Sequence, residues 1–115
     1  MATSAEDRKL LKATLDNLFR MRDEYMLLDM RSAKPETFKQ YNHELYYIGL
    51  AISHMNDRLL GSLTQQMSTK LPEFEAATRK VAADLYSLRR TSDVLSAVSS
   101  SMSTITSMVN LFKAP

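Results

Sequence analysis

The stretch that decides the fold is FKQYNHELYYIGLAISHMNDRL, residues 38–59. Its apolar side chains recur in alternating steps of three and four residues: Phe38, Tyr41, Leu45, Ile48, Ile52, Met55 and Leu59. Such steps keep side chains on one face of an α-helix, and a sustained heptad repeat is typical of helices whose side chains interlock. The segment therefore predicts a long helix that packs against a near-antiparallel neighbour.

The preceding segment repeats the same pattern. Its apolar residues, again spaced by three or four, are Leu11, Leu15, Leu18, Met21, Tyr25 and Leu28. Ser4 is suited to cap a first helix over residues 5–31. Pro35 is suited to the first turn of a second helix over residues 35–67, because its missing N–H would have no intrahelical partner there.

The C-terminal part of the chain predicts one further helix, or two. Pro72 is again suited to a first turn, and no glycine or proline interrupts residues 73–114, which favours a continuous helix over residues 72–112. The run Thr91-Ser92-Asp93 offers side chains that could instead cap a fourth helix. We expect one all-α domain over residues 1–115: an up-down bundle of three long helices, or four if the chain breaks at 91–93, with coiled-coil-like packing.

Composition excludes several classes of protein. A hydrophobic fraction of 44% is too high for intrinsic disorder, and two glycines and three prolines are too few for the turns of a β-rich fold. The absence of cysteine excludes disulfide scaffolds, thiol catalysis and cysteine-based metal sites. The first twelve residues are polar and lack the apolar run of a secretory signal, so a cytoplasmic location is expected.

The charge pattern disfavours nucleic acid as a partner. The chain has fifteen basic and thirteen acidic residues, and residues 1–31 carry six of each sign. Binding to the phosphate backbone usually requires a block of basic side chains, which no segment provides. A nucleic-acid-binding helical protein is kept as an alternative.

No catalytic or cofactor motif is complete. His43 and Glu44 begin a zinc-protease-like pair, but Tyr47 stands where the second histidine ligand should be. His43 and His54 lie on one helical face roughly 16 Å apart, too far to share a metal ion. Gly49 and Gly61 are isolated, so no phosphate-binding loop is present. We predict no enzymatic activity, no metal, no cofactor and no small-molecule substrate.

The segment VLSAVSSSMSTITSMVNLF, residues 94–112, carries no charged side chain. One face has a three-four repeat of apolar residues: Leu95, Val98, Met102, Ile105, Val109 and Phe112. Solvated helices usually carry Lys and Glu on their outer face, so the missing charge needs a reason. Three explanations remain open. The helix could occupy a central place in the bundle, it could pair with a second chain or a partner protein, or it could insert into a membrane, for which nineteen residues reach the minimum span.

These patterns favour a non-catalytic protein–protein interaction module, such as an adaptor, chaperone, inhibitor or assembly subunit. The predicted binding surface is the apolar repeat of residues 94–112 together with Tyr46 and Tyr47, since tyrosine buries apolar area while its hydroxyl tolerates water. The predicted partner is another protein or a second copy of the chain in a homo-oligomer. A membrane-active protein that inserts residues 94–112 is the other alternative.

Overall fold

The chain folds into a bundle of four helices. A computed structural model describes residues 4–113, and these contain no strand. The helices are α1 (Ala5–Met26), α2 (Pro35–Leu60), α3 (Gln65–Ser87) and α4 (Thr91–Phe112). The expected all-α bundle is confirmed, with four helices rather than three.

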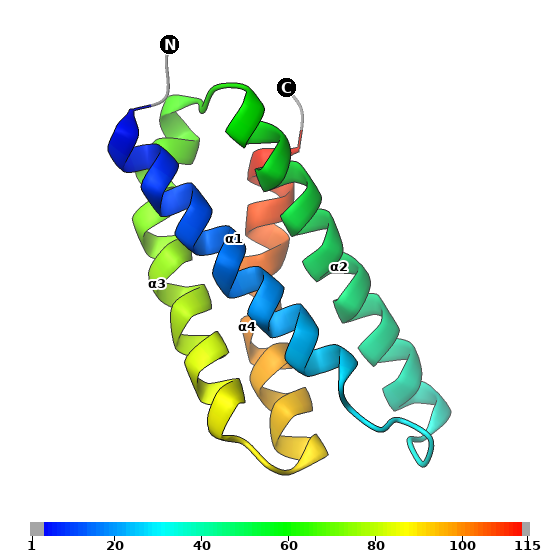
Figure 1. Cartoon of the computed structure of the whole chain (residues 1–115). Coiled ribbons are helices and arrows are strands. Elements are labelled where there is room, and N and C mark those ends of the chain that lie inside the picture. Colours follow the sequence, from blue (N-terminus) through cyan, green and yellow to red (C-terminus); the bar gives the residue numbers. More distant parts are fainter. Residues whose placement is uncertain (1–3, 114–115) are drawn as a thin grey trace.

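Consecutive helices run in opposite directions (Figure 1). Helix α1 packs on α2 and α3, and α4 packs on the same two helices, whereas α1 and α4 barely touch. Within the described residues α2 and α3 do not pack on one another, so they lie on a diagonal of the bundle. The bundle therefore has two layers, α1 with α3 and α2 with α4, and the two helices of each layer run in the same direction.

Of the two alternatives for residues 72–112, the continuous helix is wrong and the fourth helix is confirmed, with the break just before Thr91 and Arg90 at the cap position. Leu88 and Arg90 adopt extended backbone conformations, with φ/ψ of −79°/142° and −94°/135°, between the end of α3 and the start of α4. A helix of this length would be roughly 60 Å long. The bundle itself extends 49 Å. By folding back, the chain buries both Leu85 and Val94 in one core instead of leaving an apolar stripe in water.

The boundary between the second and third helices also differs from expectation. Helix α2 ends at Leu60 rather than residue 67, and Gly61 follows it. Thr64 caps α3, because its Oγ1 accepts a hydrogen bond from the Met67 N–H at 3.2 Å. Pro72, expected to open the third helix, lies inside α3. The cap at Thr64 is thus a stronger start signal than the proline.

The first helix is shorter than expected. It ends at Met26 instead of residue 31, well before Pro35. In the link that follows, the Asp29 carboxylate accepts a hydrogen bond from the backbone N–H of Arg31 at 3.1 Å. Aspartate closes turns in this way, offering the backbone an alternative to helix. Met30 from this link is buried against the core.

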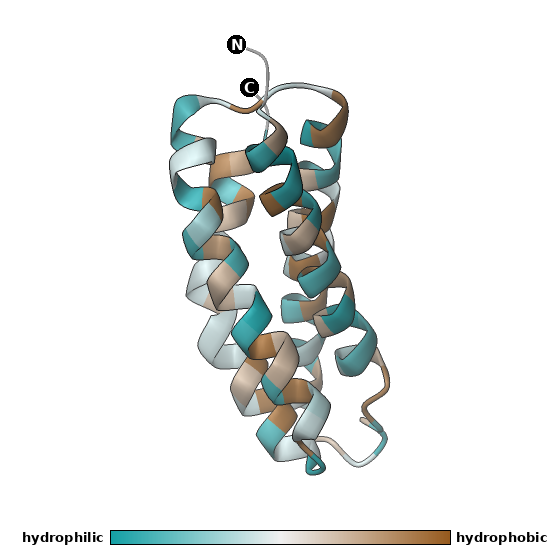
Figure 2. Cartoon of the chain, turned by 60° about the vertical axis from the view of Figure 1, so that its left-hand side comes forward, coloured by the Kyte–Doolittle hydropathy of each residue, from teal (hydrophilic) through white to brown (hydrophobic). Residues whose placement is uncertain are grey.

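All four helices contribute to a continuous apolar core. Figure 2 shows hydrophobic and hydrophilic residues alternating along the helices, as amphipathic helices require. The fully buried large side chains are Leu11, Leu18, Met21, Tyr25, Ile48, Met55, Leu71, Leu85, Val98, Ile105, Met108 and Phe112. This core fixes which face of each helix remains exposed.

Candidate functional site

The predicted apolar repeat of α4 faces its own bundle. Val98, Ile105, Val109 and Phe112 are buried, and Leu95 and Met102 are half-buried against the same core. In this conformation α2 and α3 cover these side chains. Their role in binding a partner stays a prediction, and a partner that meets the intact bundle would contact the opposite face of α4.

That opposite face consists of small polar side chains. Its exposed residues, spaced by three or four, are Ser96, Ser100, Ser103, Ser107 and Asn110. Between Asp93 and Lys113 no charged residue interrupts the helix. One flank of this face adjoins α3 and the other adjoins α2.

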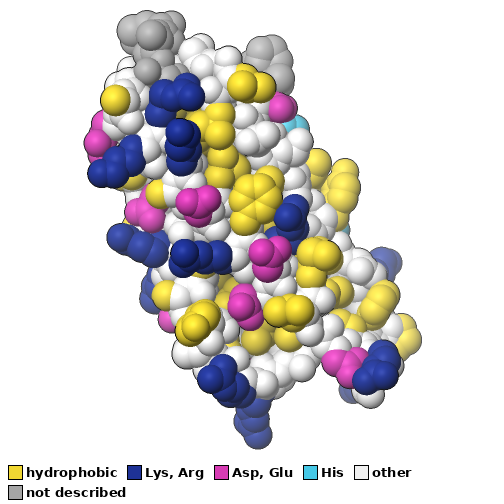
Figure 3. All heavy atoms as spheres, viewed as in Figure 1, with side chains coloured by type: hydrophobic (Ala, Val, Ile, Leu, Met, Phe, Trp, Pro, Cys, Tyr) yellow, Lys and Arg dark blue, Asp and Glu magenta, His cyan; other side chains and the backbone are white. Residues whose placement is uncertain are grey.

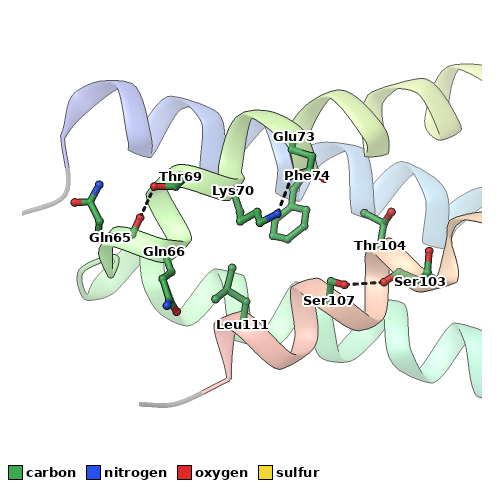
Figure 4. Close-up of a pocket in the computed structure, with 10 residues that line it drawn as sticks. All are labelled: Gln65, Gln66, Thr69, Lys70, Glu73, Phe74, Ser103, Thr104, Ser107 and Leu111. Atoms are coloured by element: carbon green, nitrogen blue, oxygen red, sulfur yellow. Dashed lines mark hydrogen bonds and ion pairs between the residues drawn. The ribbon is translucent and has the colours of Figure 1, made fainter.

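On the α3 flank the surface is hollowed into a groove of about 650 Å³ (Figure 4). Helix α3 lines it with Gln65, Gln66, Thr69, Lys70, Glu73 and Phe74, and α4 lines it with Ser103, Thr104, Ser107 and Leu111. A second hollow of about 230 Å³ shares Thr104 with it and includes Ser100. The two hollows together follow the contact between α3 and α4.

The groove combines apolar area with hydrogen-bond acceptors. Phe74 and Leu111 supply the apolar part. The Ser107 hydroxyl donates to the backbone oxygen of Ser103 at 3.0 Å, so its oxygen remains available as an acceptor. The ammonium of Lys70 lies 3.2 Å from the carboxylate of Glu73, and this pair leaves the rim with no net charge.

The two tyrosines predicted to bind a partner, Tyr46 and Tyr47, lie on α2, the helix that packs beside the other flank of α4. Tyr46 is 63% exposed, and Tyr47 is half-buried. Their rings meet edge to face with centroids 6.0 Å apart, and the Tyr47 ring lies 4.8 Å from that of His43. Since α2 and α4 form one layer, the structure brings Tyr46 and Tyr47 onto the same layer of the bundle as α4.

Beneath this layer the structure reveals a buried polar cluster that the sequence analysis missed. The Glu44 carboxylate accepts hydrogen bonds from the hydroxyl of Tyr25, from the hydroxyl of Ser99 at 2.8 Å and from the amide of Gln40 at 3.1 Å. Burial first, and then the hydrogen bond and negative charge of Glu44, raise the pKa of Tyr25 far above its ordinary value. The signal was the four-residue step from Glu44 to Ile48, which places Glu44 on the core face.

This cluster joins α1, α2 and α4, so its evident role is to fix how the helices align. In residues 4–113 no group of three or more histidine, aspartate or glutamate side chains could hold a metal ion. No helix in the same range has the combination of length and hydropathy that crossing a membrane requires.

By its fold the chain is a four-helix bundle. Comparisons with protein-family models, with curated proteins and with solved structures find no match to it.

Proposed function

We propose that the protein is a non-catalytic protein-binding module whose partner docks along the groove between α3 and α4. The observation that supports this most is the groove of about 650 Å³ beside a helix with no charged side chain from Val94 to Phe112. Serine and threonine on this exposed helix face leave it open to contact, since no long charged side chains cover it.

The lining chemistry defines the kind of partner. A charged segment entering the groove would lose hydration without gaining a counter-charge, because Lys70 and Glu73 already pair with one another. An uncharged amphipathic segment fits better. Its apolar side chains would contact Phe74 and Leu111, while its polar groups would donate hydrogen bonds to the serine and threonine oxygens of α4.

The test places two negative charges along the contact between α3 and α4, one in the groove at Ser107 and one in the adjoining smaller hollow at Ser100. Ser100→Glu with Ser107→Glu alters two exposed positions seven residues apart on α4 and should leave the fold intact. The matched control, Ser32→Glu with Ser87→Glu, adds the same charge at two exposed serines at the opposite end of the bundle. Circular dichroism and thermal melting confirm that both variants fold.

Proteins captured by the wild-type chain and by the control, but not by the groove variant, are then purified and titrated calorimetrically. We expect the groove variant to bind at least about tenfold more weakly, with equal affinity for wild type and control. Equal affinity for all three chains would refute the groove as the binding site. Binding only to lipid vesicles, or a salt-dependent affinity for nucleic acid alone, would favour one of the other two functions.

A further inference from the structure

Charged side chains are segregated between the two layers of the bundle. Figure 3 shows Lys, Arg, Asp and Glu gathered over α1 and α3. In the other layer, residues 40–56 of α2 and 94–112 of α4 contain a single charged residue, with the histidines counted as neutral. That residue is Glu44, which is 4% exposed. We call the side of these two segments that faces away from α1 and α3 the uncharged face; Ser100 and Ser107 border α3 and lie outside it.

The two segments form one continuous surface. Helices α2 and α4 pack side by side, and the Gln40 amide donates a hydrogen bond to the Ser99 hydroxyl at 3.0 Å across their contact. Tyr46 is the most exposed large apolar side chain of the α2 segment. His43 and Ser53 are exposed on either side of it, and half-buried Leu50 lies between Tyr46 and Ser53.

Charged residues flank the uncharged segment of α2 at both ends. Each end has one acidic and one basic residue. Glu36 and Lys39 precede it, and Asp57 and Arg58 follow it. Lys39 and Asp57 are eighteen residues apart, about five helical turns, so they lie on the same side of α2. Both are exposed, and Tyr46 lies between them.

We propose that the uncharged face binds a second copy of the chain, with α2 antiparallel to α2 of the partner subunit. A twofold axis across the helices near residues 47 and 48 would set Lys39 against Asp57 of the partner subunit and Glu36 against Arg58 of the partner subunit. Each charge would meet one of opposite sign, while the uncharged segments of α2 and α4 cover one another. This surface lies on the flank of α4 away from α3, so the inference does not depend on the groove partner.

The area of the face shows whether it is large enough for a specific interface. Seventeen residues of α2 give roughly 25 Å of length, and two neighbouring helices give about 20 Å of width. Pairing would therefore bury on the order of 1,000 Å² over both copies, near the lower limit for a specific interface. The dimer should be reversible and depend on protein concentration.

Sedimentation equilibrium of the full chain, from about 1 μM to about 1 mM, tests the proposal. The wild type should rise from the monomer mass of 13.1 kDa toward twice that value. Tyr46→Lys should weaken association at least about tenfold by placing like charges near the axis. Tyr86→Lys is the matched control, since Tyr86 is 80% exposed on α3, and it should associate like the wild type.

Charge reversal tests the antiparallel arrangement. Lys39→Glu and Asp57→Lys should each weaken association, whereas the chain with both changes should recover it, because each reversed charge then meets a reversed partner. The groove variant with Ser100→Glu and Ser107→Glu should associate like the wild type, which separates this proposal from the groove.

A wild type that stays monomeric at the highest concentration would overturn the proposal. So would a folded Tyr46→Lys chain that associates like the Tyr86→Lys chain, or a double reversal that fails to restore what the single reversals lose. If Tyr46→Lys proves unfolded, the reversal series alone decides.

Discussion

Replacing Tyr25 by phenylalanine tests whether the buried cluster around Glu44 holds three helices together. The change removes one hydroxyl and keeps the aromatic ring, whose centroid lies 4.7 Å from that of Tyr41. The hydroxyl donates to the Glu44 carboxylate, and both side chains are buried. Glu44 would keep its bonds from Gln40 and Ser99 but would lose its partner from α1.

A hydrogen bond to a charged group contributes about 1.5–3 kcal/mol, so we expect the free energy of unfolding to fall by about 2 kcal/mol. In a domain of this size that loss lowers the melting temperature by roughly 8 °C. Tyr41→Phe is the comparison, because the Tyr41 hydroxyl donates to the neutral backbone oxygen of Tyr25 at 2.9 Å. That change should lower the free energy of unfolding by about 1 kcal/mol.

The assay is urea unfolding followed by circular dichroism, with a double-mutant cycle through Glu44→Leu. In the Glu44→Leu background the acceptor is gone and the buried Tyr25 hydroxyl has lost its bond, so Tyr25→Phe should cause no further loss and should restore part of the stability. An equal loss in both backgrounds would refute the assignment of the stability to this hydrogen bond. A loss below about 0.5 kcal/mol in the wild type would refute it as well.

Three further predictions concern the core, a helix cap and alkaline pH. Ile105→Ala should lower the free energy of unfolding by about 2–5 kcal/mol, with no direct loss of association. Leu60→Ala, at a position 93% exposed, should change it by less than about 0.5 kcal/mol in the same urea assay. Thr64→Ala should lower it by about 0.5–2 kcal/mol, with amide exchange rising first in the opening turn of α3. Burial raises the pKa of both Tyr25 and Tyr41, so stability should fall as pH rises past about 10, where the unfolded chain releases protons that the folded chain retains.

Each of these predictions has a contradicting result. If Ile105→Ala dissociates a dimer without destabilising the chain, the apolar repeat of α4 is an interface rather than core. If Thr64→Ala leaves exchange in α3 unchanged, the cap does not set the start of that helix. If Tyr25→Phe combined with Tyr41→Phe leaves the alkaline slope of stability unchanged, the two hydroxyls do not cause it.

Helix identity was predictable from the sequence, whereas helix ends were less so. The three-four repeats located each amphipathic face, because side-chain burial follows the helical period directly. The helix ends were harder to predict, because several residues near each boundary can start or stop a helix and the sequence does not show which of them prevails. Pro72 looked like a start, yet Thr64 and Gly61 set the boundary. The break before Thr91 follows from packing, since only folding back lets α4 share the core.

The candidate site was predictable in composition but not in position. The uncharged segment 94–112 was visible in the sequence, but a buried apolar face and an interface have the same repeat. That Val98 and Ile105 lie in the core, and that exposed serines of α4 line a groove against α3, depends on which helices become neighbours. The layer of α2 and α4 arises from diagonal placement of α2 and α3, which no local pattern specifies.

A concentration series of two-dimensional nitrogen–proton spectra on the full chain is the most direct test of association through the layer of α2 and α4. Between dilute and concentrated samples, amide shifts should change at outward positions of residues 40–56 and 94–112, centred on Tyr46, while α1 and α3 stay constant. Shifts that gather on α1 and α3, or spectra that do not change up to about 1 mM, would contradict the proposal that this layer binds a second copy.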